Sequence, residues 1–183
     1  MQPAFTLASR VLHWLMAAMI LAMLFIGVGM VASLTDYHWL VDIHRPLGIA
    51  ILALAALRLL NRLRRPAPPL PADMPVLLKF AAHASHVALY GLMFALPMVG
   101  WAMLSAAGYP IVLYGPWTLP PILPHDAGLY AQLRLAHTLL AYALFATFLA
   151  HLGAALLHAF IFRDGVFGSM ASLKSTDRLR RGS

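Results

Sequence analysis

The sequence contains no cysteine and no glutamate. Without cysteine the chain forms no disulfide and offers no thiolate to a metal ion or an iron–sulfur cluster. Its acidic residues are six aspartates in or near the predicted connections between apolar segments, so carboxylates do not mark a path for metal ions across a membrane. These absences leave histidine, with nine copies, as the only strong ligand type present in quantity.

Charge is also scarce. Only 10% of the residues are charged and 62% are hydrophobic, with a mean hydropathy of +0.79, whereas an ordinary soluble domain has roughly 25% charged residues. This composition indicates an integral membrane protein. Four apolar stretches approach or exceed the ~20 residues needed to cross the hydrocarbon core. They predict an all-α, four-helix transmembrane bundle with helices at about 11–34, 39–61, 80–106 and 130–162.

The first stretch is longer than the apolar core of a signal peptide, so we expect a retained helix. Lysine and arginine accumulate on the cytoplasmic side of membrane proteins, which predicts that both termini are cytoplasmic. The net charge of +7 then reflects topology and contact with anionic lipid, and we expect no nucleic-acid partner. The basic residues that set this orientation are Arg10, Arg62, Arg64, Arg65, Lys79, Arg163, Lys174, Arg178, Arg180 and Arg181.

The connections suggest one domain with a short tail. RRPAPPLPADMP predicts an extended cytoplasmic linker, and the prolines and glycines of GYPIVLYGPWTLPPILPHD exclude a spanning helix from a periplasmic connection that is placed to cap a buried site. Residues 1–170 are predicted to form the membrane domain. The chain after Phe167 is polar and is predicted to be loosely ordered, with 171–183 forming a basic cytoplasmic tail.

The histidines sort by depth into two layers. His137 and His151 are fourteen residues apart, roughly 21 Å and close to four helical turns, so both leave the same helix face. His44 and His137 belong to the periplasmic layer. The cytoplasmic layer holds five candidates: His13, His83, His86, His151 and His158. His38 and His125 lie at loops and are predicted to be solvated.

Two histidines from different helices at equal depth can supply both axial ligands of a b-type haem, so two layers predict two haems. Small residues one turn from the histidines would make room for a porphyrin edge, namely Ala17, Gly48 and Ala141. The alternative is a hydrogen-bonded packing role, and the partner of His13 stays open among the inner candidates. His83, His86 and His158 fit a proton path or quinone pocket better than a ligand role.

Arginines inside the spans suggest anion partners. Arg58 lies fourteen residues after His44, on the same face and about 21 Å deeper. Its guanidinium would suit a haem propionate, or it extends to the headgroups with its basic neighbours. Arg45 and Arg134 are candidates for the outer propionates, and they give the periplasmic face a positive field.

Several runs of the sequence together resemble the prokaryotic cytochrome b561 family, small four-helix di-haem membrane proteins. The resemblance covers about residues 5–170. The order and spacing of these runs are specific to the family, although a single motif such as a His-Trp pair is weak evidence. The runs are SRVLHWL, IHRPLGI followed by LRLLNRLRRPAPP, AHASHVALYGLMFALPMVGW, and HTLLAYAL with AHLGAALLHAFIFRDG.

The resemblance implies a quinone-linked electron carrier of the bacterial inner membrane, in which His13 pairs with His151 and His44 pairs with His137 as ligands of two haem b groups. It further implies a superoxide oxidase, which passes electrons from periplasmic superoxide to ubiquinone without requiring a protein partner. Arg134 would then attract superoxide, and His86 and His158 would supply protons to the quinone. The membrane lipid is the remaining partner.

Two other functions stay open. The chain is also compatible with the cytochrome b anchor of a periplasmic dehydrogenase or hydrogenase, although its outer loops are short for docking a partner. A histidine-based metal-ion transporter is less favoured, because transporters usually place carboxylates or thioethers along the path.

Overall fold

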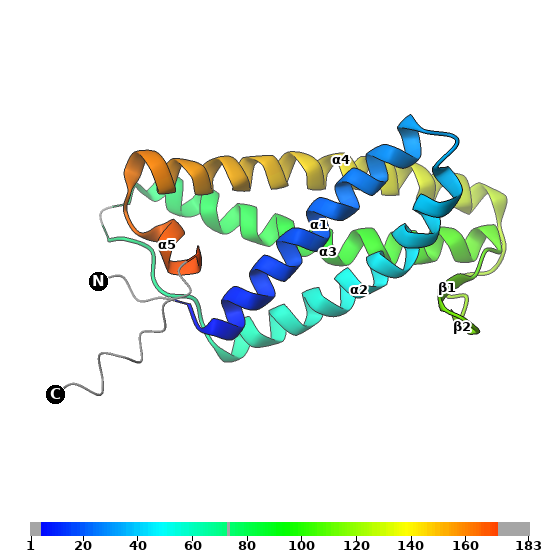
Figure 1. The fold of residues 1–183 in the computed structure, drawn as a ribbon, viewed down its shortest axis with the longest axis horizontal. Coiled ribbons are helices and arrows are strands. Elements are labelled where there is room, and N and C mark those ends of the chain that lie inside the picture. The colour runs from blue at the N-terminus through cyan, green and yellow to red at the C-terminus, as the bar shows by residue number, and fades with distance from the viewer. Residues whose placement is uncertain (1–4, 73, 172–183) are drawn as a thin grey trace.

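Four long helices form the body of the molecule in the computed structural model, which describes residues 5–72 and 74–171. Each helix is long and apolar enough to cross a membrane, which confirms the predicted four-helix membrane bundle (Figure 1). The predicted tail beyond Ala171 lies outside the described residues. The helices are α1 (Leu7–Ala32), α2 (Tyr37–Arg64), α3 (Val76–Ala107) and α4 (Ala127–Leu157).

Each helix begins before the apolar stretch that predicted it, and in α1 and α4 a side-chain cap marks the start. The Thr6 hydroxyl accepts a hydrogen bond from the Ser9 amide and starts α1 at Leu7. The Asp126 carboxylate accepts from the Leu129 amide at 2.8 Å and starts α4. A hydropathy window does not detect these capping residues.

The helices do not pack equally against one another. α1 packs along α2, α3 packs along α4, and a smaller contact joins α2 to α3. Among the described residues, the backbones of α1 and α4 are not closely packed, and neither are those of α2 and α4. Space for side chains or a bound group therefore lies between α4 and the first two helices.

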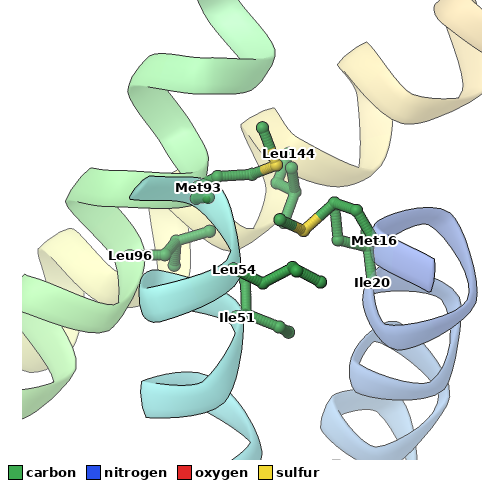
Figure 2. Packing of buried hydrophobic residues seen from close by; sticks show 8 residues of the cluster. Met16, Ile20, Ile51, Leu54, Met93, Leu96 and Leu144 are labelled. Carbon is green, nitrogen blue, oxygen red and sulfur yellow. The ribbon is translucent and has the colours of Figure 1, made fainter. Parts of the chain in front are cut away.

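An apolar core crosses the middle of the bundle (Figure 2). Every long helix contributes to it, and Figure 2 shows these side chains pointing toward one another. On α4 the core residue Leu144 lies midway in sequence between His137 and His151, so the two histidine layers are separated by hydrocarbon. The buried residues are Met16, Ile20, Ile51, Leu54, Ala55, Met93, Leu96 and Leu144.

The connection between α3 and α4 contains a small hairpin that the all-α prediction did not include. Strands β1 (Ile111–Tyr114) and β2 (Trp117–Leu119) pair antiparallel, and β1 packs against α2. The Trp101 indole donates to the Pro120 carbonyl at 2.9 Å and ties the connection to α3. Its prolines interrupt a helix without preventing a two-stranded turn.

The opposite end of the bundle is closed by the chain after α4. This helix continues as a π-helical turn, η1 (His158–Phe162), and a short helix α5 (Val166–Ala171) then folds back toward the start of α1 (Figure 1). The Trp14 indole donates to the Met170 carbonyl at 3.3 Å. The prediction of loose order directly after Phe167 is therefore wrong for the residues up to Ala171, because these residues form α5, which packs on η1 and α4.

Candidate functional site

The outer histidines meet between α2 and α4. The ring centres of His44 and His137 are 6.2 Å apart, and the ring planes are inclined by 66°. The rings therefore face each other edge-on and do not stack. This proximity agrees with the prediction that the two residues lie at the same level of the bundle.

The inner histidines form a larger group at the other end of the bundle. The ring centres of His13 and His151 are 6.3 Å apart with an inclination of 64°. His86 of α3 also approaches His151, at 5.4 Å between ring centres. The structure thus brings together three of the five inner candidates.

The spacing of the two cross-bundle pairs suits one metal ion between each pair of rings. Metal–imidazole bonds of about 2.0–2.1 Å, added to about 1.2 Å from each nitrogen to its ring centre, put two opposed rings about 6.4 Å apart. The His13–His151 and His44–His137 distances agree with this spacing. The His86–His151 distance is shorter.

The helix packing distinguishes the same pairs. A planar macrocycle between two axial histidines needs the helix backbones to stand apart, and the loosely packed pairs of helices, α1 with α4 and α2 with α4, are those that carry the two cross-bundle histidine pairs. By contrast, His86 and His151 lie on α3 and α4, which pack closely. Gly100 adds room beside the outer pair, because a Cβ there would lie 3.3 Å from Cε1 of His137.

Unpartnered buried nitrogens gather at the two layers. Within the part of the chain that the structure describes, every buried side-chain nitrogen or oxygen without a hydrogen bond belongs to His44, His137, Arg10 or Arg45. For His137 this holds even though the Leu96 carbonyl lies near its ring. Buried polar atoms normally have partners. Each layer therefore contains buried nitrogens whose partner is not among the described residues. Imidazoles for a metal and guanidiniums for carboxylates fit a haem with its propionates.

Arg58 reaches the inner histidines instead of extending away from the bundle. Its Nη2 donates to Nδ1 of His13 at 2.8 Å, and its guanidinium carbon lies 5.6 Å from the centre of the Tyr90 ring. A guanidinium only donates, so Nδ1 of His13 accepts and Nε2 carries the proton in this arrangement. If Nε2 of His13 binds a metal, Nδ1 carries the proton instead, so Arg58 must move away from Nδ1.

A cavity opens beside Arg58 between α1, α2, α3 and α5. Its polar wall includes Ser9, Asn61 and Tyr90, and the Asn61 amide donates to the Ser9 hydroxyl at 2.8 Å. Phe5 and Met170 contribute an apolar wall. The cavity holds only about 20 Å³, so its lining side chains would have to move to admit a polar ring head with an apolar tail.

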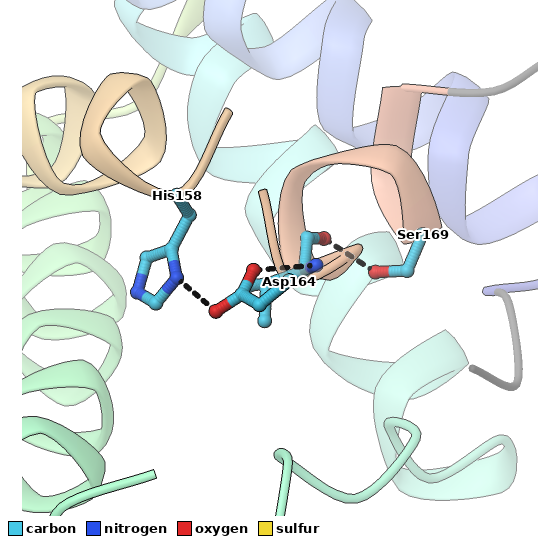
Figure 3. Close-up of polar contacts among 4 residues, drawn as sticks. His158, Asp164 and Ser169 are labelled. Atoms are coloured by element: carbon cyan, nitrogen blue, oxygen red, sulfur yellow. Dashed lines mark hydrogen bonds and ion pairs between the residues drawn. The ribbon is translucent and has the colours of Figure 1, made fainter. Parts of the chain in front are cut away.

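The remaining predicted residues lie apart from the histidine pairs. His83, His38 and His125 are exposed, and so is Arg134 near the start of α4. His158 does not reach His86; its Nδ1 contacts the Asp164 carboxylate at 2.6 Å, and Asp164 also accepts from the Val166 amide (Figure 3).

Asp36 carries negative charge at the end of the bundle that holds the outer pair. The Trp39 indole donates to it at 3.0 Å and the Ser33 hydroxyl at 2.8 Å. These two hydrogen bonds hold the pKa of Asp36 below its usual range. The carboxylate therefore stays charged at neutral pH and opposes the positive field of Arg134.

The sequence analysis missed several residues beside the site. Arg10 was assigned to topology alone, although it lies three residues before His13, the same spacing as Arg134 before His137. Asn61 and Arg58 are three residues apart on one helix face, a spacing that pointed to a shared site. The contacts of Gly100 and Asp164 depend on helix pairing and on the turn after α4, so no local pattern marked them.

The comparisons with known proteins agree with this arrangement. The sequence model described as prokaryotic cytochrome b561 matches residues 4–172. The chain is 35% identical over 174 residues to cytochrome b561 homolog 2 of Escherichia coli (strain K12), covering 92% of each chain. It is 34% identical over 171 residues to the probable superoxide oxidase CybB of Yersinia pestis, covering 89% of this chain and 93% of that protein.

Proposed function

The chain belongs to the prokaryotic cytochrome b561 family of haem b electron-transfer proteins, and we propose that it oxidises periplasmic superoxide and reduces ubiquinone through two haem b groups. His44 and His137 would hold the outer haem, and His13 and His151 the inner one. When bound, the two haems supply one-electron redox chemistry at opposite faces of the membrane. We place the termini and the inner pair on the cytoplasmic side of the bacterial inner membrane.

The observation that carries this proposal is the pair of matched histidine sites on either side of the apolar core. Their ring spacings of 6.2 and 6.3 Å are nearly equal. Each site joins α4 to a helix that does not pack closely against it. The similarity to a protein named probable superoxide oxidase supports the choice of donor.

The reaction balances with two superoxide ions for each quinone. Each superoxide loses one electron and leaves as O₂, which requires no proton. The quinone gains two electrons and two protons and becomes a quinol. The chain must therefore attract an anion at one face and deliver protons at the other.

Arg134 and Arg45 are the residues we assign to the superoxide side. The exposed Arg134 raises the local concentration of a small anion by long-range attraction. The Nε of Arg45 is buried without a partner, which suits contact with a haem propionate. The negative charge of Asp36 weakens this attraction, so the net field for superoxide depends on Arg134, Arg45 and Asp36 together.

The quinone side uses the cavity beside Arg58. Ser9, Asn61 and Tyr90 supply hydrogen bonds for a quinone head. His86 lies next to His151 and would pass a proton toward this region. His158, held by Asp164, would take protons up from the cytoplasm. These proton roles require a path between His158 and His86, since the two are not in contact.

A stopped-flow experiment on the purified protein in nanodiscs tests the function. Superoxide alone should reduce the haem absorbance, and a short-chain ubiquinone should reoxidise it and accumulate as quinol. A b-type spectrum with no reduction by superoxide would favour the dehydrogenase anchor. A protein purified without haem from haem-sufficient cells would instead favour the metal transporter.

Reversing the charge of Arg134 should slow the reaction with superoxide. For Arg134→Glu we expect about a tenfold lower rate of haem reduction at low salt, because an attractive field becomes repulsive. The decline of the rate with added salt should weaken or invert, since salt screens such a field. Stopped-flow traces at several ionic strengths measure both effects.

Asp36→Asn provides the matched control of opposite sign, and its rate with superoxide should rise. A neutral reductant should be unaffected by either change. If Arg134→Glu slows superoxide and the neutral reductant equally and also disturbs the spectrum, Arg134 is a structural partner of the propionates and steering is unsupported.

A larger side chain at Gly100 should weaken the outer site alone. In Gly100→Val the added carbons meet the His137 ring, which a Cβ already approaches to 3.3 Å. Such overpacking typically costs about 1–3 kcal/mol, which corresponds to roughly 5- to 150-fold in outer-haem affinity. Haem per protein measures the loss. Gly91→Val is the control on the same helix, since a Cβ there meets nothing within 4 Å; equal haem loss in both variants would contradict the packing argument.

A further inference from the structure

Arg10 is the most buried charged side chain among those that the structure describes. Only 4% of its surface is exposed, and neither Nε nor Nη1 has a hydrogen-bond partner. The single ion pair within residues 5–72 and 74–171 joins His158 to Asp164, so no described carboxylate compensates Arg10. A guanidinium cannot lose its charge at physiological pH.

The place of Arg10 in α1 makes this burial more costly. It stands in the first turn of the helix, where the helix dipole is positive and disfavours a cation. No acidic residue occupies that turn. A buried charge without a partner is strongly destabilising, so this position requires an anion that the described residues do not supply.

The neighbourhood of Arg10 indicates which anion it is. His13 follows three residues later on the same helix face, about 4.5 Å along the axis. Both side chains lean toward the N-terminus of α1, so they stay neighbours about one turn apart. An anion at Arg10 therefore lies beside whatever His13 binds.

The outer layer also has an arginine with a buried nitrogen on the helix of its first histidine, although at a different spacing. Arg45 follows His44 directly, and its buried Nε also lacks a partner. Each of the two pairs thus has one arginine on the same helix as its first histidine, with a buried nitrogen available. In the inner layer Nδ1 of His13 accepts from Arg58, whereas no described group accepts from Nε or Nη1 of Arg10.

We propose that Arg10 binds a propionate carboxylate of the inner haem and raises the potential of that haem. This proposal rests on the proposed function, because it requires a haem between His13 and His151. A lipid phosphate offers similar anionic oxygens, but the 4% exposure of Arg10 and its spacing from His13 favour the carboxylate. Arg10 is a binding residue and takes no part in proton transfer.

Redox titration of the two haems in the purified protein tests the proposal without relying on turnover. In Arg10→Gln the inner haem loses a nearby positive charge that favours the reduced form. We expect its reduction equilibrium to shift about tenfold toward the oxidised form, which is about 59 mV for one electron. The outer midpoint should stay unchanged and reports that the bundle is folded. Arg45→Gln should have the reverse pattern, and Arg64→Gln, an exposed residue at the end of α2, should move neither.

Arg10→Lys keeps the charge but loses the two-pronged contact. Its inner-haem midpoint should lie close to the wild-type value, with the reduction equilibrium shifted only about threefold toward the oxidised form. If Arg10→Gln does not accumulate, Arg10→Lys decides alone, and an inner midpoint identical to the wild type overturns the proposal. An unchanged inner midpoint in Arg10→Gln, with or without loss of bound phospholipid, overturns it as well.

These outcomes separate the proposal from the function on which it rests. A wild-type protein that contains only one haem, or none, contradicts the two-haem function before any variant is made. Two haems with normal superoxide oxidation and an inner midpoint insensitive to Arg10 contradict only the role of Arg10.

Discussion

Replacing His44 or His137 with alanine should remove the outer haem and leave the inner one, so that haem per protein falls by about half. Each variant deletes one of the two histidines, with ring centres 6.2 Å apart, that would hold the outer haem. The inner histidines are on the far side of the apolar core and are untouched. Haem extraction and the spectrum of the reduced protein measure the loss.

His38→Ala and His125→Ala are suitable controls for this prediction, because both residues are exposed. Neither should change the haem content. Retention of both haems in His44→Ala or His137→Ala would show that the outer pair is not a ligand pair. Loss of both haems together with loss of folded protein is distinguished by the helical signal in circular dichroism.

At the inner site we expect His13→Ala and His151→Ala to lose the inner haem and His86→Ala to keep it. The sequence leaves open which two of these three histidines are the ligands, and all three rings lie close together in the structure. The distances and the helix packing favour His13 over His86: the His13 ring is 6.3 Å from His151 across loosely packed helices, whereas His86 is 5.4 Å away on a closely packed one.

The His86 variant also carries a second expectation, which its haem spectrum alone does not test. If His86 passes protons to the quinone, His86→Ala should slow quinol formation while superoxide still reduces the haem at the normal rate. A His86 variant without the inner haem, beside a His13 variant that retains it, would make α3 the ligand donor. The assignment of His13 would then be wrong.

The sequence by itself determined the class of the protein and the approximate depth of its histidines. Hydropathy identifies a spanning segment because crossing the bilayer demands about 20 apolar residues, whatever the neighbouring helices do. The fourteen-residue spacing of His137 and His151 likewise follows from helical geometry alone. The family resemblance rests on the same linear order of motifs.

The tertiary structure decided the matters that depend on which helices pack together. Arg10 and Arg134 both stand three residues before a histidine, yet Arg10 is buried and Arg134 is exposed. No local pattern distinguishes them, because exposure is set by neighbours distant in the sequence. The close approach of Gly100 to His137 has the same origin in the contact between α3 and α4. The sequence thus specified which residues reach each depth of the membrane, and the packing of the helices decided which of them face one another.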